Sequence, residues 1–316
     1  MMDWTDRHCR FLHRQISRRV LLYTEMVTAQ ALVRGGARHL LAHDSAEHPV
    51  AAQLGGSDPV MLAEAARIAA EEGYCEVNLN VGCPSDRVQS GCFGAVLMRR
   101  PGLVADCVAA MAARSSAEIT VKCRIGVDED EPREVLPDFL EAVAAAGVRR
   151  VIIHARKAWL AGLSPRENRE IPPLDHDLVL DMSRAFPSLS IDLNGGIDSL
   201  EAAKGWLRRG VHGVMVGRAA YHGPYDLLSR ADAEIWGEAT PPPSREEVVD
   251  RMRPYLAAHL AAGGRLQSVT RHMLGLFAGQ PGARAWRRVL SEGASRPGAG
   301  LDLLATALAS QRQMAA

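Results

Sequence analysis

Residues 76–86 read EVNLNVGCPSD, and this stretch decides how the rest of the chain is interpreted. Polar and apolar side chains alternate from Glu76 to Val81, which predicts a strand, and the glycine and proline beside Cys83 predict a turn directly after it. In parallel α/β proteins, the strand ends form the rim where catalytic groups are displayed. A thiol at that rim can act as a nucleophile or a proton donor. The stretch therefore indicates an enzyme with Cys83 as its catalytic residue.

Six more short apolar runs predict strands, at 21–28, 50–56, 119–126, 149–156, 190–197 and 213–219. Ala-rich amphipathic segments lie between them and predict helices over 58–72, 101–114, 133–146, 175–185 and 199–209. This alternation predicts the α/β fold class, with a (β/α)8 TIM barrel over residues 1–240.

An eight-stranded barrel needs one strand more than these runs supply. Residues 1–6, MMDWTD, read as a loop leading into a helix over 5–18, which Thr5 or Asp6 can cap. We therefore expect the first strand to be missing from this chain and to lie upstream of a late start.

The pattern changes after Trp236. Thr240 to Ser244 form a stiff, Pro-rich linker, and no strand signal follows it. Helices are predicted over 245–262, 266–278, 281–292 and 299–313. We expect a second, all-α domain over residues 241–316.

The formal net charge is zero, but its distribution is uneven. From Arg245 onward there are ten arginines and five acids, so this quarter carries about +5 and the rest about −5. Arginine matches the geometry of phosphate, which suggests a polyanionic partner for the C-terminal helices. A solvated helical surface is the alternative explanation.

Composition excludes several classes of protein. No apolar stretch is long enough to span a bilayer and the N-terminus lacks a signal peptide, so we expect a cytoplasmic protein. The sequence shows neither a nucleotide-binding glycine motif nor metal-ligand spacing, and we expect no metal. The six cysteines predict free thiols, of which Cys75, Cys107 and Cys123 are expected in the core, while Cys92 has no clear role.

Two glycine-containing segments follow the last two predicted strands. These are Asn194-Gly195-Gly196 and Gly217-Arg218. Loops at these places in a barrel often cradle a phosphate, because glycine lets backbone N–H groups approach the anion. Each segment alone could equally be a structural turn.

Charged residues on two predicted strands suggest a further ligand. Lys122 could contact a cofactor ring, form a Schiff base or pair with a buried acid. His154 and Arg156 are two residues apart and so share a strand face, where they suit a phosphate or cofactor contact. A core histidine is the alternative for His154.

The motifs, taken together, resemble those of the tRNA-dihydrouridine synthases, and in particular the A-type branch, from Met2 nearly to the C-terminus. They include QLGG (53–56), NLNVGCPSDRVQSGCFGA (78–95), VKCRIG (121–126), HGVMVGR (212–218) and TRHMLGLFAGQPGARAWRR (270–288).

The resemblance implies an FMN-dependent enzyme that uses NADPH to reduce uridine in tRNA to 5,6-dihydrouridine. Reduced FMN would deliver hydride to C6 of the uracil and Cys83 a proton to C5. The residues that it implies for FMN binding are Gln53, Lys122, His154, Asn194, Gly195, Gly196, Gly217 and Arg218. Met1 and Met2 correspond to the end of a segment that lies beside the flavin in this family. The earlier residues of that segment are absent from this sequence.

For tRNA, the resemblance implies Asn80 beside the target base, Arg166 and Arg169 in the loop 157–172, and Arg284 and Arg287 on the C-terminal helices. The last two are three residues apart, so they share a helix face. The A-type branch acts on positions 20 and 20a of the D-loop. We expect a monomer that binds neither DNA nor membranes.

Three alternatives remain open at this point. The chain could be an FMN barrel enzyme that acts on a free pyrimidine, which leaves the arginine-rich helices without a role. A Schiff-base aldolase that uses Lys122 explains less. A tRNA-binding protein that has lost catalysis with its first strand is the third.

Overall fold

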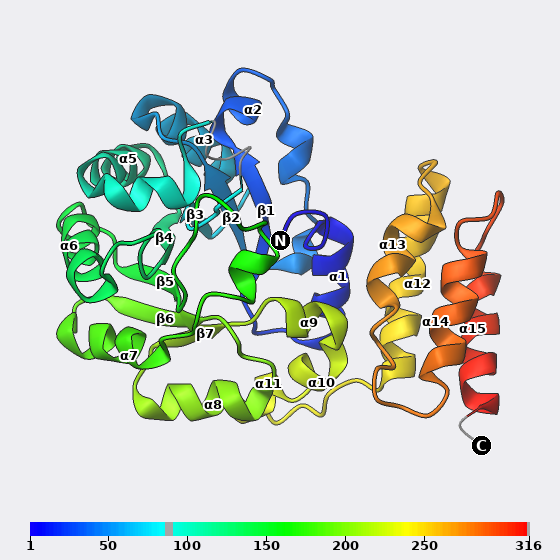
Figure 1. The fold of residues 1–316 in the computed structure, drawn as a ribbon. Helices are drawn as coiled ribbons and strands as arrows, with labels where there is room; N and C mark the ends of the chain where they lie inside the picture. The colour runs from blue at the N-terminus through cyan, green and yellow to red at the C-terminus, as the bar shows by residue number, and fades with distance from the viewer. Residues whose placement is uncertain (86–90, 315–316) are drawn as a thin grey trace.

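The computed structural model describes residues 1–85 and 91–314. Its centre is one curled sheet of parallel strands in the order β1 to β7, with helices covering the outer face (Figure 1). The strands are β1 (Leu22–Thr28), β2 (Val50–Gly55), β3 (Glu76–Val81), β4 (Glu118–Arg124), β5 (Arg150–His154), β6 (Ser190–Asn194) and β7 (Gly213–Met215). Every predicted strand is confirmed, and β1 and β7 are the edge strands in the described part of the chain.

The helices between the strands also follow the prediction closely. Asp58 caps α3 and Ser199 caps α8, each by accepting a backbone N–H bond, which explains why these helices begin where they do. The predicted helices are α3 (Pro59–Glu71), α5 (Pro101–Arg114), α6 (Pro132–Ala145), α7 (His176–Ala185) and α8 (Leu200–Arg209). The short helices α2 (Ala29–Val33), which follows β1, and α9 (Arg218–His222), α10 (Pro224–Leu228) and α11 (Ala231–Trp236), which follow β7, were not predicted.

The two faces of the sheet differ in chemistry. On β3, Val77, Leu79 and Val81 pack into the main core beneath the outer helices. The intervening residues Glu76, Asn78 and Asn80 point to the other face, because successive strand residues alternate. The inner face is therefore lined with polar groups, an arrangement that suits a ligand better than a dry barrel core.

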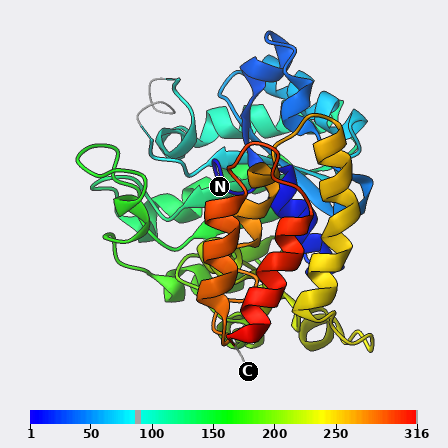
Figure 2. The same cartoon turned by 90° about the vertical axis from the view of Figure 1, so that its right-hand side faces the viewer.

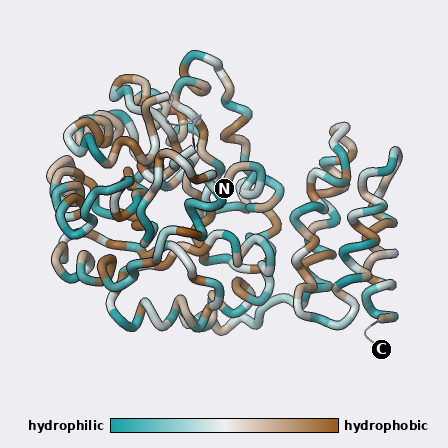
Figure 3. Tube along the Cα trace, viewed as in Figure 1, coloured by the Kyte–Doolittle hydropathy of each residue, from teal (hydrophilic) through white to brown (hydrophobic). Residues whose placement is uncertain are grey.

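A second core joins the two ends of the chain. Leu12 and Ile16 of α1 (Arg7–Ile16) are buried together with Val249, Leu256 and Trp286 of the C-terminal helices. Figure 2 shows α1 behind these helices, and Figure 3 shows hydrophobic and hydrophilic residues alternating along them, as expected of helices that bury one face. They are α12 (Arg245–Ala261), α13 (Leu266–Met273), α14 (Ala283–Gly293) and α15 (Asp302–Gln313).

Some details differ from the prediction. Cys75 is exposed, whereas Cys107 and Cys123 are buried as expected; all six cysteines are free thiols. Cys75 follows a helix end and precedes β3, so apolar neighbours in sequence do not bury it. The first helix begins at Arg7 with Asp6 as its cap. The division at residue 240 remains a prediction.

Candidate active site

Cys83 lies in the loop directly after β3, where the sequence predicted it. The side chain of Asn80 holds this loop: its Oδ1 accepts the backbone N–H groups of Gly82 at 3.1 Å and Cys83 at 3.0 Å. The Cys83 thiol is half-buried and lies 3.5 Å from the hydroxyl of Ser85. Residues 86–90, which belong to the same sequence motif, are outside the described residues.

Gln53 and Asn80 lie side by side on the inner face. The Asn80 Nδ2 donates to Gln53 Oε1 at 2.9 Å, and Gln53 Nε2 donates to Asn78 Oδ1 at 3.0 Å. Both polar atoms of the Asn80 carboxamide thus bond to protein. Asn80 orients the cysteine loop, whatever contact it also makes with a ligand.

Next to the cysteine loop, the buried guanidinium of Arg124 connects two loops. Its Nε donates to the Gly82 carbonyl at 3.1 Å, and its Nη1 donates to the carbonyls of Asn168 at 3.0 Å and Lys157 at 3.3 Å. Arg124 thereby joins the cysteine loop to the loop 157–172. Arg124 is not among the site residues expected from the sequence; its position two residues after Lys122, on the same strand face, was the available signal.

Four cations, Lys122, Arg124, Arg156 and Arg169, lie around His154, and Arg218 lies near Arg156 and Arg169; we call these five residues the cationic cluster. Burial and the charge of Arg124 lower the pKa of Lys122 to about 8. Burial and the charges of the cluster hold the pKa of His154 well below its ordinary value, so this imidazole is neutral. Burial and the charge of Arg218 likewise lower the pKa values of Arg156 and Arg169. These shifts all point to a site with more positive charge than its own acids balance.

The acids near the cluster are few. Among the described residues, Glu170 is the carboxylate paired with it: it lies 2.7 Å from Arg218 and 3.6 Å from Arg166, outside the cluster. No described residue makes a hydrogen bond to the Lys122 ammonium, and the buried Nε of Arg156 has no partner. Unpaired buried donors are costly, so the cluster fits an anionic ligand such as a phosphate.

The glycine segments flank this cluster. Gly195 has φ 111°, and a Cβ there would lie 2.6 Å from the His154 ring. Gly196 has φ 70°, and a Cβ would lie 2.5 Å from Leu174. Asn194 is fixed by a bond from its Nδ2 to the Met215 carbonyl, 2.8 Å. Glycine is therefore required at both positions, and it brings the backbone close to His154.

The remaining cofactor candidates are Gly217, Met1 and Met2. Gly217 precedes α9, and a Cβ there would lie 3.3 Å from the Met1 sulfur. Met2 is 60% exposed. The structure thus places Met1 next to the Gly217–Arg218 segment and leaves the Met2 side chain mainly in solvent.

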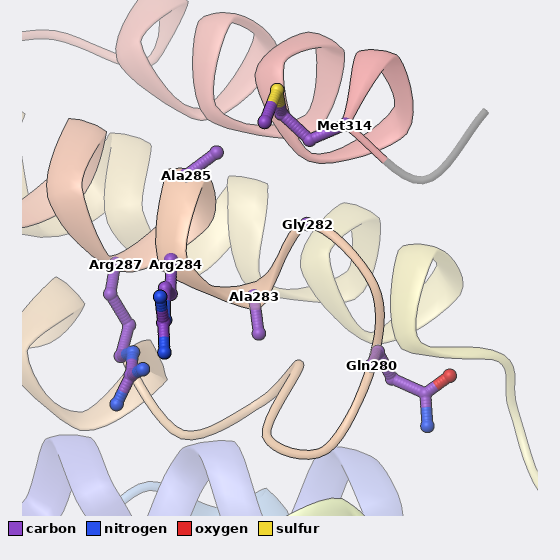
Figure 4. Close-up of a pocket in the computed structure, with 7 residues that line it drawn as sticks. All are labelled: Gln280, Gly282, Ala283, Arg284, Ala285, Arg287 and Met314. Atoms are coloured by element: carbon purple, nitrogen blue, oxygen red, sulfur yellow. The ribbon is translucent and has the colours of Figure 1, made fainter.

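The arginines predicted to contact tRNA fall into two groups. Arg166 and Arg169 belong to the loop 157–172, which is held by the buried side chain of Asn168 through bonds to the backbone of Trp159 and Leu163. Arg284 and Arg287 begin α14 and line an open pocket of about 360 Å³, where their side chains point the same way (Figure 4). Both are exposed, and no described acid pairs with either. The structure brings the first group to the cysteine loop and keeps the second on the C-terminal helices.

Two other kinds of site are absent from residues 1–85 and 91–314. No group of three or more His, Cys, Asp or Glu side chains is arranged there to hold a metal ion. No helix in the same ranges has the length and apolar character needed to cross a bilayer.

Comparison with known proteins gives consistent matches over almost the whole chain. A family model described as dihydrouridine synthase matches residues 1–312. A tRNA-dihydrouridine(20/20a) synthase of Shewanella oneidensis is 56% identical over 304 residues, covering 96% of this chain and 90% of that protein. Proteins of the same name from Vibrio parahaemolyticus and Escherichia coli are each 54% identical, covering 98% of this chain and 94% and 89% of their own lengths.

Proposed function

The chain belongs to the dihydrouridine synthase family, and from this membership we propose that it is a tRNA-dihydrouridine synthase that reduces uridines 20 and 20a of tRNA. The observation that carries the proposal is the position of Cys83. Its thiol stands just after β3, in a loop whose Gly82 carbonyl accepts a hydrogen bond from Arg124 of the cationic cluster, and among the described residues Glu170 is the carboxylate paired with that cluster. A thiol beside an anion site suits an enzyme that combines a phosphate-bearing cofactor with proton transfer.

We infer that the cofactor is FMN. The residues that would hold it are Gln53, Lys122, His154, Asn194, Gly195, Gly196, Gly217 and Arg218, with Met1 and Met2 beside them. The Arg156 Nε, which is buried without a partner in the described part of the chain, supports a ligand with a phosphate, and the partly buried Lys122 ammonium supports an electron-rich ring beside it. When bound and reduced by NADPH, FMN supplies the hydride that C6 of the uracil receives.

The protein's own part in the reaction is proton transfer and positioning. As C6 gains hydride, the C5=C6 double bond is lost and C5 must take a proton, which the Cys83 Sγ donates. Asn80 keeps Sγ in place by holding the backbone N–H groups of Gly82 and Cys83. Lys122, whose pKa of about 8 leaves it largely cationic at neutral pH, would stabilise negative charge on a flavin ring held beside it.

The substrate reaches the site as an extruded base. Unstacking a loop nucleotide costs a few kcal/mol, which phosphate contacts must offset. Arg166 and Arg169 lie near the cysteine loop and would hold the nucleotides beside the target, while Asn80 borders the base itself. Arg284 and Arg287, exposed and unpaired on α14, would bind phosphates farther along the tRNA.

The proposal extends to the fold, the domain organisation, the cellular location and the oligomeric state. We propose that the curled sheet belongs to a (β/α)8 barrel, and that residues 241–316 form a tRNA-binding domain. We further propose a cytoplasmic monomer. Sedimentation of the purified protein tests the monomer, since a dimer would double the measured mass.

Replacing the thiol tests the proposed chemistry. Cys83→Ala should retain flavin, measured by its visible absorbance, and should form no dihydrouridine in tRNA, measured by mass analysis of digested transcripts. The exposed Cys75→Ala is the matched control and should keep parental activity. If Cys83→Ala reduces tRNA at the parental rate, the proton donor is another group.

A further inference from the structure

Below the cysteine loop, a line of hydrogen bonds crosses the inner face of β2, β3 and β4. It starts at the buried carboxylate of Glu76, whose Oε1 accepts from the hydroxyls of Tyr23 and Thr120, each at 2.6 Å. Thr120 Oγ1 in turn accepts from Asn78 Nδ2 at 2.8 Å. We call Glu76, Thr120, Asn78, Gln53 and Asn80 the amide chain.

The register of the sheet places these side chains next to one another. Gln53 pairs with Asn78, and Asn78 pairs with Thr120, in adjacent parallel strands. Asn78 and Thr120 have no measurable exposure, so water does not replace their bonds. A buried polar group without a partner is costly, and each bond in the chain is therefore strongly favoured.

The bonds all run in one direction. The Glu76 Oε1 accepts from both the Tyr23 and Thr120 hydroxyls, so Thr120 directs its proton to Glu76 and presents a lone pair to Asn78. Asn78 must then turn Nδ2 to Thr120 and Oδ1 to Gln53. By the same reasoning, Gln53 offers Oε1 to Asn80, and Asn80 turns Oδ1 to the backbone N–H groups of Gly82 and Cys83.

We propose that Asn78 and Thr120 are positioning residues for Cys83: through Gln53 they fix the orientation of the Asn80 carboxamide, which holds the cysteine loop. This inference rests on the proposed function, because it assigns them to the step in which Cys83 donates its proton. Neither residue touches the loop itself. Without the hydrogen bonds of the amide chain, the Asn80 carboxamide can flip. Its NH2 group would then face the backbone N–H groups of Gly82 and Cys83, and donors would face donors.

The variant Thr120→Val tests the proposal. Valine has the shape of threonine and suits a strand, but it offers Asn78 no acceptor. The matched control Thr120→Ser retains the hydroxyl. Stopped-flow measurement separates reduction of bound flavin by NADPH from reoxidation of reduced flavin by tRNA. Thr120→Val should slow the second rate by about tenfold or more, as expected for a misplaced donor, and should change the first rate much less.

A second readout does not depend on turnover. The rate at which iodoacetamide alkylates Cys83 is measured between pH 6 and pH 10 by mass spectrometry of the peptide that contains Cys83. This rate reports the ionisation and accessibility of the thiol. Thr120→Val should shift this pH profile, and Thr120→Ser should not. If Thr120→Val does not give a soluble flavoprotein, Asn78→Ser replaces it in both measurements. The shorter serine side chain does not reach Gln53.

The outcomes separate this inference from the proposed function. If the Thr120→Val or Asn78→Ser flavoprotein matches the parent in both readouts while Cys83→Ala is inactive, the positioning role is wrong and the function stands. If Cys83→Ala is itself fully active, the function fails first. Slowed reoxidation in Thr120→Val with a normal Thr120→Ser supports the inference.

Discussion

Several side chains of the candidate site make hydrogen bonds to the backbone of neighbouring loops. Arg124 donates to three carbonyl groups, and Asn168 and Asn80 also bond to loop backbone. Such residues are hard to identify from sequence, because their partners lie in distant segments. The position of Cys83 directly after a strand, by contrast, could be predicted, because glycine and proline beside it mark the strand end. Its catalytic role stays a prediction.

Gly195 is the residue where a single methyl group should matter most. Gly195→Ala combines an unfavourable φ of 111° with a contact of 2.6 Å to the His154 ring. We expect a loss of about 1–3 kcal/mol in the free energy of unfolding, together with weaker flavin retention. Chemical denaturation and flavin absorbance of the purified variant measure the two effects.

Gly205 provides the matched control for this substitution. It lies inside α8, and nothing is within 4 Å of the position that a Cβ would take. Gly205→Ala should raise the stability by about 0.5–1 kcal/mol, because alanine favours helix. Equal effects of the two substitutions would contradict the proposed role of the Gly195 backbone.

At the scale of elements, the strands and helices were predictable because periodicity and capping residues agree along most of the chain. The strand β7 is the exception, since only Gly213–Met215 form it where a run to 219 was expected. Glycine at 217 breaks the run, and α9 begins at Arg218. The cationic cluster was partly predictable from strand ends, whereas the amide chain depends on register between strands, which no single run of sequence reveals.

One contact between helices should respond to pH. Asp6 caps α1 and also binds Arg271 and His272 of α13, at 2.6 Å and 3.0 Å. Burial raises the pKa of Asp6, but hydrogen bonds from His272, the Cys9 N–H and Arg271 outweigh it and hold the pKa well below its ordinary value of 3.8. Because the folded-state pKa is lowered, this stabilisation is present above pH 4 and is lost as the pH falls further.

Asp6→Asn keeps the cap but removes the charge. We expect it to lower the free energy of unfolding by about 1–3 kcal/mol at pH 7, with the difference from the parent shrinking at pH 3. Denaturation curves at both values measure this. Asp106→Asn, at an exposed position on α5, should change nothing. A difference that grows in acid would contradict the assigned sign.

The exposed face of α14 should contribute to tRNA binding through charge. Replacing both Arg284 and Arg287 by alanine should weaken binding and reduce the slope of log affinity against log salt by about 0.7–0.9 for each phosphate that is no longer neutralised. Titrations at several salt concentrations measure the slope. Arg184→Ala on α7, which Figure 1 shows on the side away from α14, should leave it unchanged.

At the scale of the whole molecule, α1 connects the sheet to the C-terminal helices. It lies before β1 in sequence but buries Leu12 and Ile16 in the second core. Composition alone suggested a linker and a separate domain, because the sequence does not show which helix faces meet. Ending the chain at residue 240 should therefore expose an apolar face of α1.

We expect this shortened protein to unfold at a lower temperature than the parent and to bind the dye ANS, which reports exposed apolar surface. Differential scanning calorimetry and dye fluorescence measure these effects. A further change, Leu12→Ser in the shortened protein, serves as the control: it should restore solubility without raising the unfolding temperature. A shortened protein with parental thermal stability would show that the second core is dispensable.

The same packing affects how the protein is made. A helix near residue 10 leaves the ribosome long before its partners after residue 245, and at 5–20 residues per second the interval is on the order of tens of seconds. Through that time the nascent polypeptide carries Leu12 and Ile16 without their final neighbours. A polypeptide released before residue 245 would keep this apolar face of α1 exposed for as long as it persists.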